Sequence, residues 1–227
     1  MDPTRLSPRT VGVVRLLVIA AVVGVALVWT VIASAEEVIP REASKWAPTL
    51  KAEVRRVYGL DQDLAPFFGQ VHQESRWRSS AASRYASGMA QFTPGTARDM
   101  QRSKEMRDLC GDPAGCPTDP RWALRGLVRF DHDLWVPLAA VKRAKERLAF
   151  TLVGYNGGSG WVQKERAKCA ADHGSLWVPG SGCDKDRWFG HVSRYCVRAE
   201  WACKESRQYP EIILNRWSPL YAAWLAR

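Results

Sequence analysis

The pattern of apolar and polar residues divides the chain into an uncharged N-terminal run and a longer segment with helical periodicity. Residues 16–35 carry no charged side chain, and at about 1.5 Å per residue this run is long enough to cross about 30 Å of hydrocarbon. Three arginines precede the run and two glutamates follow it, so residues 36–227 are expected to be exported. Because the run ends in A-S-A, which resembles a cleavage site, it is predicted to be either a membrane anchor or a signal peptide.

Helical periodicity predicts most of the remaining elements, after a tether over residues 36–46. Helices are expected over about residues 50–58, from 61 or 63 to 74, from 94 onward, over 122–135 and over 138–150, with an irregular loop at 103–118 and a short extended segment at 89–92. In the helix at 122–135, the apolar stripe leaves Asp131 and Asp133 on the other side, where water is expected to solvate them. The pattern therefore predicts a mainly α-helical fold.

Glu74 closes one of these apolar stripes. Leu64, Phe67, Val71 and Glu74 are spaced at i, i+3, i+7 and i+10, which places them on one face of a helix. A carboxylate on such a face loses hydration, and the partial negative charge of a helix C-terminus acts on it as well. Both effects favour the protonated form that a general acid needs. Alternatively, Glu74 extends from the end of the stripe into water, as most glutamates at helix ends do.

The residues from Glu74 onward form a first motif with a known counterpart. The sequence reads E-S-R-W-R from Glu74 and, after a loop rich in Ser and Ala, G-M-A-Q-F-T-P from Gly88. It resembles the first signature of the soluble lytic transglycosylase family, in which E-S, an aromatic residue and a small-residue loop precede G-L-M-Q-L-M-P. The chain departs from this pattern in three ways: Ser79 replaces the usual Pro, Ala90 replaces the customary Met, and the loop is one residue shorter. These departures concern the loop and not the acid.

A second motif lies further along the chain, in the order that the family has it. The stretch Y-N-G-G-S-G from Tyr155 is similar to the family's A-Y-N-A-G-x-G-x-V. Alone, this stretch is typical of an ordinary turn after a helix, because N-G and G-G are turn dipeptides. Together with the first motif it makes the resemblance specific, over about residues 47–165.

The resemblance implies a fold, an activity and a set of site residues. The fold is a goose-lysozyme-like helical domain with a small extended segment beside an active-site groove. The activity is cleavage of the β-1,4 bond between MurNAc and GlcNAc in peptidoglycan, with Glu74 as sole acid and base, 1,6-anhydro-MurNAc ends as products and no cofactor or metal. The implied substrate-binding residues are Ser75, Gly88, Met89, Gln91, Phe92, Tyr155 and Asn156. Of these, Ser75 and Gln91 are expected to hydrogen-bond near the acid, and Tyr155 to orient Glu74 or the sugar.

The number of carboxylates leaves two alternatives open. Hydrolysing glycosidases commonly use two carboxylates, and here Asp99, Asp131 and Asp133 belong to no motif. A transglycosylase needs only one, because the sugar's own 6-hydroxyl takes the place of an activated water. The alternatives are a lysozyme-type hydrolase on the same fold, which phage lysis or a secretion apparatus could use, and a non-catalytic wall-binding protein.

The net charge limits the classes of binding partner that are expected. The chain carries a formal charge of +10, and it still carries +8 without residues 1–35, which hold three arginines and one aspartate. Such a surface favours an acidic partner, either nucleic acid or a cell wall with anionic polymers. Nucleic acid is not expected, because the basic residues are scattered along the chain and the N-terminal run predicts export. The expected partners are peptidoglycan glycan strands and, through the N-terminal segment, the membrane.

Six cysteines follow the apolar run, and an even number on the exported side indicates disulfides. Short loops favour the pairs Cys110–Cys116, Cys169–Cys183 and Cys196–Cys203, although six cysteines allow 15 pairings. The alternative is a zinc site with His173 and His191, but no tight C-x-x-C pair is present.

The cysteine- and Trp-rich segment 169–227 is expected to be an extension packed on a catalytic domain at 47–168. A hydrophobic content of 46% with eleven tryptophans supports a sizeable core. The apolar residues of the last helix-like stretch, from Tyr209 onward, are expected to pack onto the domain rather than bind sugar.

Overall fold

The computed structural model describes residues 39–112, 114–172 and 182–227, and all statements below concern these residues. The apolar run 16–35, its expected cleavage site and His173 of the alternative zinc site lie outside them. None of the helices in the described ranges has the length and apolar character that a membrane crossing requires.

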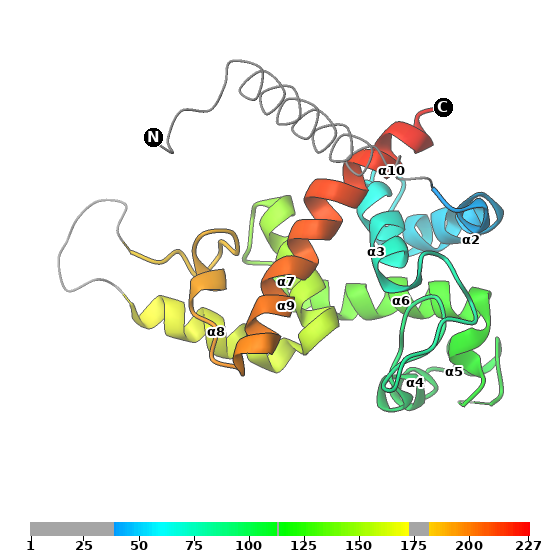
Figure 1. Ribbon diagram of the computed structural model, residues 1–227, viewed down its shortest axis with the longest axis horizontal. Helices are drawn as coiled ribbons and strands as arrows, with labels where there is room; N and C mark the ends of the chain where they lie inside the picture. The colour runs from blue at the N-terminus through cyan, green and yellow to red at the C-terminus, as the bar shows by residue number, and fades with distance from the viewer. Residues whose placement is uncertain (1–38, 113, 173–181) are drawn as a thin grey trace, which may run out of the picture. The chain divides into compact units, whose positions relative to one another are not determined.

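The described chain is mainly helical, which confirms the predicted fold class in its coarse form (Figure 1). The α-helices are α2 (Arg41–Tyr58), α3 (Ala65–Ser75), α4 (Pro94–Met100), α5 (Lys104–Arg107), α6 (Pro120–Trp135), α7 (Ala144–Gly157), α8 (Ser159–Ala171), α9 (Glu200–Ile212) and α10 (Ser218–Leu225). Short 3-10 turns are η1 (Cys116–Thr118), η2 (Val136–Leu138) and η3 (Val192–Arg194), and a π-helical turn, η4 (Ile213–Trp217), joins α9 to α10. In place of the expected extended segment at 89–92, the backbone forms two isolated bridges, which pair Ser87 with Ala82 and with Phe92.

Helix α2 begins at Arg41, so the second half of the expected tether at 36–46 is helical instead. Its buried residues Ala43, Ala47, Leu50 and Val54 form an apolar stripe with helical spacing. Burial of this stripe stabilises the helix even though Pro48 lies inside it and cannot donate a backbone hydrogen bond. The prediction was wrong here because it gave Pro48 and the local charges more weight than the stripe.

Helix α7 also differs from the prediction, which placed a helix at 138–150. Pro137 lies in η2, just after α6, and α7 starts six residues later than expected and continues to Gly157. The buried run from Ala149 to Gly154 carries the helix through the second motif. Tyr155, Asn156 and Gly157 therefore form the last turn of a helix and not a free turn.

Helix α6 lies against α2 and α7, and α9 lies along α7 (Figure 1). Helix α3 packs against η4 and α10, so the C-terminal helices cover it. The contact is close: a Cβ atom on Gly69 of α3 would lie 2.9 Å from Cβ of Trp217. The segment after residue 169 is thus an integral part of the helical core around α3.

Three disulfides close short loops of the chain, and they confirm the predicted pairing. The bonds join Cys110 to Cys116, Cys169 to Cys183 and Cys196 to Cys203. Disulfides are typical of proteins that fold in an oxidising compartment. The alternative of a zinc site at the last four cysteines is wrong, because all of them are bonded to sulfur.

Candidate active site

Glu74 lies in the last turn of α3, directly before a sharp turn of the chain. Arg76 and Trp77 both have positive φ angles, of 51° and 64°, which are uncommon for residues other than glycine. Trp77 is fully buried, and its Nε1 donates a hydrogen bond of 2.6 Å to the hydroxyl of Tyr221 in α10. The C-terminal helix thereby holds the turn, and with it the end of α3 that carries Glu74.

The carboxyl group of Glu74 combines partial exposure with a strongly perturbed pKa. The residue is partly exposed, and the hydroxyl of Tyr209 in α9 donates a hydrogen bond to its Oε1. Loss of hydration raises the pKa of Glu74 to about 8; the Tyr209 hydrogen bond acts in the opposite direction, and the nearby charge of Glu205 raises the pKa further. Glu74 can therefore hold a proton near neutral pH, as the sequence predicted.

Tyr155 joins the two sequence motifs. Its hydroxyl donates a hydrogen bond of 2.7 Å to the backbone carbonyl of Ala90, 65 residues earlier in the chain. Its ring lies against Phe92 and Phe130, with ring centroids 5.9 and 5.3 Å away. Burial, with the charge of Glu74 as a smaller cause, raises the pKa of Tyr155 well above its usual range. Tyr155 thus holds the 88–92 loop, whereas the expected role was to orient Glu74 or the sugar.

The 88–92 loop is fixed by its own backbone and by the core. Gly88 has a φ of 80°, and a Cβ atom there would lie 1.5 Å from the carbonyl oxygen of Pro117, so only glycine fits. The Nε2 of Gln91 donates to the carbonyls of Gly88 and Ala81, at 2.9 and 3.2 Å. Its amide nitrogen therefore closes the loop, and only its carbonyl oxygen is left for a substrate.

Met89 and Phe92 were expected to bind substrate, and the structure corrects this. Their exposed fractions are 1% and 2%, and Phe92 packs edge-on against Trp122 and Phe130. Both side chains are apolar, and their burial in the core stabilises the fold more than exposure to water at a groove would. Both side chains therefore belong mainly to the core, although Phe92 also lines a separate cavity beside Pro94 and Pro117.

Ser75 and Asn156 have different positions. The Ser75 side chain is buried, and its hydroxyl donates to the carbonyl of Val71 one turn earlier in α3, at 3.3 Å. It is thus bonded to its own helix and not to Glu74. Asn156, in contrast, is partly exposed and lines a cavity that also includes Glu205. It can contact a ligand, as the second motif implied.

Asp131 is fully buried, which contradicts the expectation that it is solvated. Gln70, one turn before Glu74 in α3, donates from Nε2 to Oδ1 of Asp131 at 3.2 Å, while Oδ2 has no hydrogen-bond partner within the described residues. Desolvation raises the pKa of Asp131 well above its usual range, and the charge of Glu74 adds to this. The prediction was wrong because α6 has neighbours on more than one side, so a residue off its main stripe is still enclosed. Asp133 is exposed, as predicted.

Tyr209 is the residue of the site that the sequence motifs did not include. It lies beyond the range of the family resemblance, in a stretch that was expected only to pack, and it is 6% exposed. The boundary placed at residue 168 therefore divides the site, because Glu74 lies before it and its hydrogen-bond partner after it.

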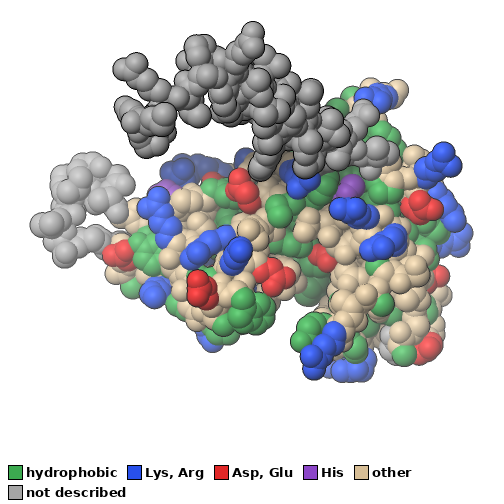
Figure 2. All heavy atoms as spheres, viewed as in Figure 1, with side chains coloured by type: hydrophobic (Ala, Val, Ile, Leu, Met, Phe, Trp, Pro, Cys, Tyr) green, Lys and Arg blue, Asp and Glu red, His purple; other side chains and the backbone are tan. Residues whose placement is uncertain are grey.

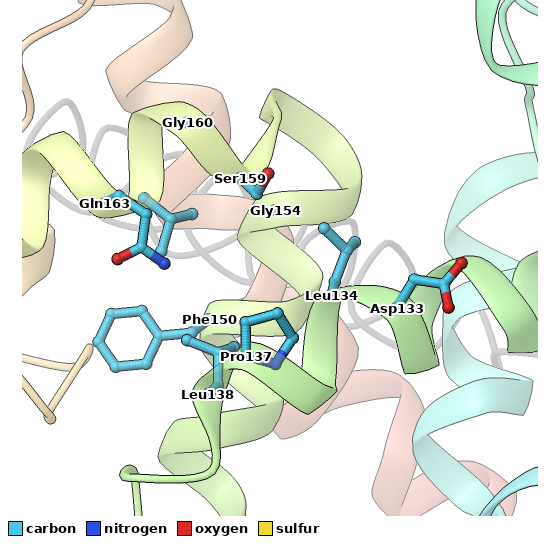
Figure 3. A pocket seen from close by; sticks show the side chains of 10 residues that line it. Asp133, Leu134, Pro137, Leu138, Phe150, Gly154, Ser159, Gly160 and Gln163 are labelled. Atoms are coloured by element: carbon cyan, nitrogen blue, oxygen red, sulfur yellow. The ribbon is translucent and has the colours of Figure 1, made fainter. Parts of the chain in front are cut away.

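A second, more apolar pocket lies away from these residues, between α6, η2, α7 and α8. Its volume is about 180 Å³, and it is lined by Leu134, Pro137, Leu138 and Phe150, among others. In Figure 3, Asp133 lies at the margin of this pocket, apart from the cluster of Pro137, Leu138 and Phe150. It shares no residue with the Glu74 site. Within the described residues, no three His, Cys, Asp or Glu side chains come together as a candidate metal site.

A scan against protein-family models finds no match for this chain, and no curated protein matches it either. The resemblance to the lytic transglycosylases therefore stays a prediction that depends on the two motifs. What the geometry adds is that Tyr155 of the second motif bonds to the loop of the first motif, and that Tyr209 of α9 bonds to Glu74, whose pKa is raised.

Proposed function

We propose that this protein is a peptidoglycan lytic transglycosylase with Glu74 as its only catalytic carboxyl group. The observation that carries the proposal is the state of Glu74: it is partly exposed, bonded to Tyr209, and has a pKa raised to about 8. A carboxyl group in this state can donate a proton at neutral pH, and as a carboxylate it can take one back.

The finer fold belongs to the same proposal. A goose-lysozyme-like domain is supported by the helical architecture and by the position of the acid at the end of a helix whose neighbours are α10 and η4. The two isolated bridges at Ser87 stand where the resemblance implies a small extended segment, and they are compatible with it.

In the first step, Glu74 protonates the oxygen of the glycosidic bond between MurNAc and GlcNAc. The C1–O bond breaks, the GlcNAc part leaves with the proton, and positive charge develops at C1 of MurNAc. Glu74 is now a carboxylate, and the hydrogen bond from Tyr209 stabilises this form, since it lowers the pKa of the group.

In the second step, the Glu74 carboxylate removes the proton from the 6-hydroxyl of the same MurNAc. The 6-oxygen attacks C1 and closes the 1,6-anhydro ring, and Glu74 is protonated again for the next cycle. No water enters the reaction, so a second carboxylate that activates water has no role in it.

A hydrolase on the same fold is the alternative, and Asp131 is the observation that bears on it. Asp131 is a buried carboxyl group that is electrostatically coupled to Glu74, while Glu205, whose charge also acts on Glu74, is exposed. However, Asp131 has no exposed surface, and its raised pKa favours the neutral form. A neutral carboxyl group without contact to solvent is poorly suited to act as base or nucleophile, and this argues against Asp131 as a second catalytic carboxylate.

The proposal also includes an extracytoplasmic site of action and the cell wall as the substrate. Three disulfides and the uncharged run before residue 36 support an extracytoplasmic site of action, with a membrane anchor or a cleaved signal peptide at the N-terminus. On the face drawn in Figure 2, Lys and Arg side chains are spread out with Asp and Glu among them. A dispersed positive charge suits an extended anionic wall better than one nucleic-acid footprint.

Digestion of purified sacculi, followed by mass spectrometry of the released muropeptides, tests the proposal. The expected products are lighter by one water than those of hydrolysis, because the 6-hydroxyl of the sugar replaces the water. Products with a reducing-end MurNAc would assign the protein to the hydrolases. Release of no fragments by the wild type, with retention of wall binding, would indicate a non-catalytic wall-binding protein.

A further inference from the structure

A cavity of about 370 Å³ lies where the start of α9 meets the junction of α7 and α8. Asn156, Trp161, Arg198, Trp201 and Glu205 contribute to its walls. Its volume is within the range of roughly 300–1,000 Å³ that small-molecule sites have.

Two tryptophans give this cavity an exposed aromatic wall. Trp201, in the first turn of α9, is 72% exposed, and Trp161, in the first turn of α8, is 37% exposed. The other large exposed apolar side chains in the described part of the chain include no tryptophan. Exposure of a large indole to water is unfavourable, and two of them at one cavity indicate a surface that a ligand covers.

The walls are held rigidly in place. The disulfide between Cys196 and Cys203 encloses the short segment that carries both Arg198 and Trp201. Arg198 forms a two-pronged ion pair with the fully buried Glu165 of α8, with both N–O distances at 2.9 Å. Because the disulfide and the buried ion pair already fix these residues, binding at the cavity costs little ordering of the protein.

The charges around the cavity favour a neutral ligand. The guanidinium of Arg198 is already neutralised by Glu165 and packs 6.0 Å from the Trp161 ring centroid. Glu205 takes part in no ion pair within the described residues, so its carboxylate offers hydrogen-bond acceptors. Lys164 lies beside this wall, with its Nζ 4.5 Å from the Trp161 ring centroid, so its positive charge offsets the negative charge of Glu205. A ligand without net charge suits this pair, and its hydroxyl and amide groups can donate to Glu205.

Glu205 links the cavity electrostatically to Glu74. Glu205 lines the cavity, and it is near enough to Glu74 for its charge to raise that pKa. Tyr209 lies one turn after Glu205 in α9 and donates its hydroxyl proton to Glu74. Asn156 lines the cavity from the second motif. Helix α9 therefore carries both the hydrogen-bond partner of Glu74 and part of the aromatic wall.

We propose that this cavity is a saccharide subsite, in which one N-acetylhexosamine of the glycan strand packs its C–H face on Trp201. Trp161 forms the second apolar wall, and Asn156 and Glu205 hydrogen-bond the polar edge of the sugar. The inference rests on the proposed function, since it places one further unit of the same glycan beside the sugars that Glu74 acts on. A stem-peptide carboxylate would meet the like charge of Glu205 at this edge, and the charge of Arg198 is already paired with Glu165.

The test uses a neutral oligosaccharide and a background in which turnover is blocked. Glu74→Gln protein, with and without Trp201→Ala, is titrated with N-acetylchitotetraose by isothermal calorimetry. Loss of the aromatic platform should weaken binding roughly three- to tenfold, while Trp201→Phe should retain most of the affinity. The matched control is Leu60→Ala, which removes a side chain that is 78% exposed on the loop between α2 and α3. It should leave binding unchanged.

A second measurement locates the ligand even if a variant is destabilised. In a ¹H–¹⁵N spectrum of the Glu74→Gln protein, the indole N–H signal that disappears in Trp201→Phe should shift on addition of N-acetylchitotetraose. L-Ala-γ-D-Glu, as the peptide probe, should leave it unshifted. Equal affinity of the Trp201→Ala protein, no binding of the tetrasaccharide, or a shift with the dipeptide alone would overturn the inference.

These outcomes are separate from those of the proposed function. Trp201-dependent sugar binding without anhydro products from the wild-type protein would support the subsite and contradict the proposed transglycosylase activity. Anhydro products together with Trp201-independent binding would support the transglycosylase activity and contradict the subsite.

Discussion

The hydroxyl of Tyr209 donates a hydrogen bond to the carboxyl group of Glu74 from a helix that lies 135 residues further along the chain. Tyr209 is almost fully buried, and its own pKa is raised well above the usual range, first by burial and then by the charge of Glu74. It therefore remains a hydrogen-bond donor near neutral pH. The bond favours the ionised form of Glu74 and opposes the burial that disfavours it.

Tyr209→Phe is expected to move the pH dependence of activity to higher pH. The substitution removes the donor that stabilises the Glu74 carboxylate, so the pKa of Glu74 rises above its value of about 8. The basic limb of the pH–rate profile on glycan strands should shift in the same direction, and turnover should fall because the carboxylate formed in the first step has lost its stabilising hydrogen bond. Tyr85→Phe, at a tyrosine that is 70% exposed, is the control and should leave the profile unchanged. A shift to lower pH in Tyr209→Phe would contradict the assigned role.

Glu74→Gln is expected to reduce turnover on glycan strands by at least about 10²–10⁴-fold, the usual contribution of general acid–base catalysis. The amide keeps the shape and can still accept from Tyr209, but it cannot exchange the proton. Binding of glycan strands should persist. The measurement is the rate of muropeptide release from sacculi.

The matched controls for Glu74→Gln are amide substitutions at other carboxyl groups. Asp99→Asn and Asp133→Asn change exposed residues, and Asp131→Asn replaces a buried acid by a neutral group of the same shape. All three should stay within a few-fold of the wild type. An Asp131→Asn protein as inactive as Glu74→Gln would favour a two-carboxylate mechanism instead.

The sequence predicted much of the helical core and the three disulfides. The apolar stripe of α6 has a clear helical period, and the disulfide pairing followed from short loops. Helix α3 is buried at every position from 65 to 72, so the stripe that ends at Glu74 is only one part of its buried surface. Local signals of this kind depend on neighbours in sequence, which is why they can be recognised without the fold.

The parts that the sequence missed depend on contacts between distant segments. Asp131 is off the stripe of its helix, and only the packing of α6 among its neighbours shows that it is buried. Met89 and Phe92 stand at motif positions near the groove, but their side chains turn into the core. Tyr209 has no local pattern that marks it, because its role comes from a partner 135 residues away. The one available signal was a tyrosine in an otherwise apolar stretch, where a buried hydroxyl needs a partner.

Reduction of the disulfides is expected to lower the melting temperature. Each bond restricts the unfolded chain, and bonds of this kind contribute about 2–4 kcal/mol, more for longer loops. Cys169–Cys183 spans 14 residues, against 6 and 7 for the other two, so its replacement by two serines should have the largest effect. Thermal unfolding of the three double variants gives the order, and non-reducing peptide mapping of the wild type should find no free thiol. Two or more free thiols in exported protein would contradict the pairing.

Gly157→Ala is expected to destabilise the protein, unlike the same substitution three residues later. A Cβ atom at Gly157 would lie 2.1 Å from Nη1 of Arg198, so the guanidinium would have to move away from Glu165. Disruption of such a buried pair costs about 3–5 kcal/mol when a partner is lost, and a displacement should cost part of that. In Gly160→Ala the added Cβ has no neighbour within 4 Å, and alanine favours the helix by roughly 0.5–1 kcal/mol. Urea unfolding of both variants should give opposite signs; equal effects would mean that Arg198 adapts without loss.

Glu74→Gln is also expected to stabilise the fold, by an amount that grows with pH. The ordinary pKa of a glutamate is 4.5, and that of Glu74 in the native state is about 8. Between these values the native protein holds a proton that the unfolded chain has lost, so the stability of the wild type falls by up to about 1.4 kcal/mol per pH unit as pH rises, and becomes constant above the native pKa.

Glutamine at position 74 does not titrate, so the variant escapes this loss. The difference in free energy of unfolding between the Glu74→Gln protein and the wild type should be close to zero at pH 4, positive at pH 6 and largest at pH 8. Asp131 is destabilising in the same direction, but it is present in both proteins and largely cancels in the difference. Urea unfolding at the three pH values measures it. A variant that is no more stable than the wild type at pH 8 would show that Glu74 ionises freely in the native protein, and the proposed general acid would then lack its proton at neutral pH.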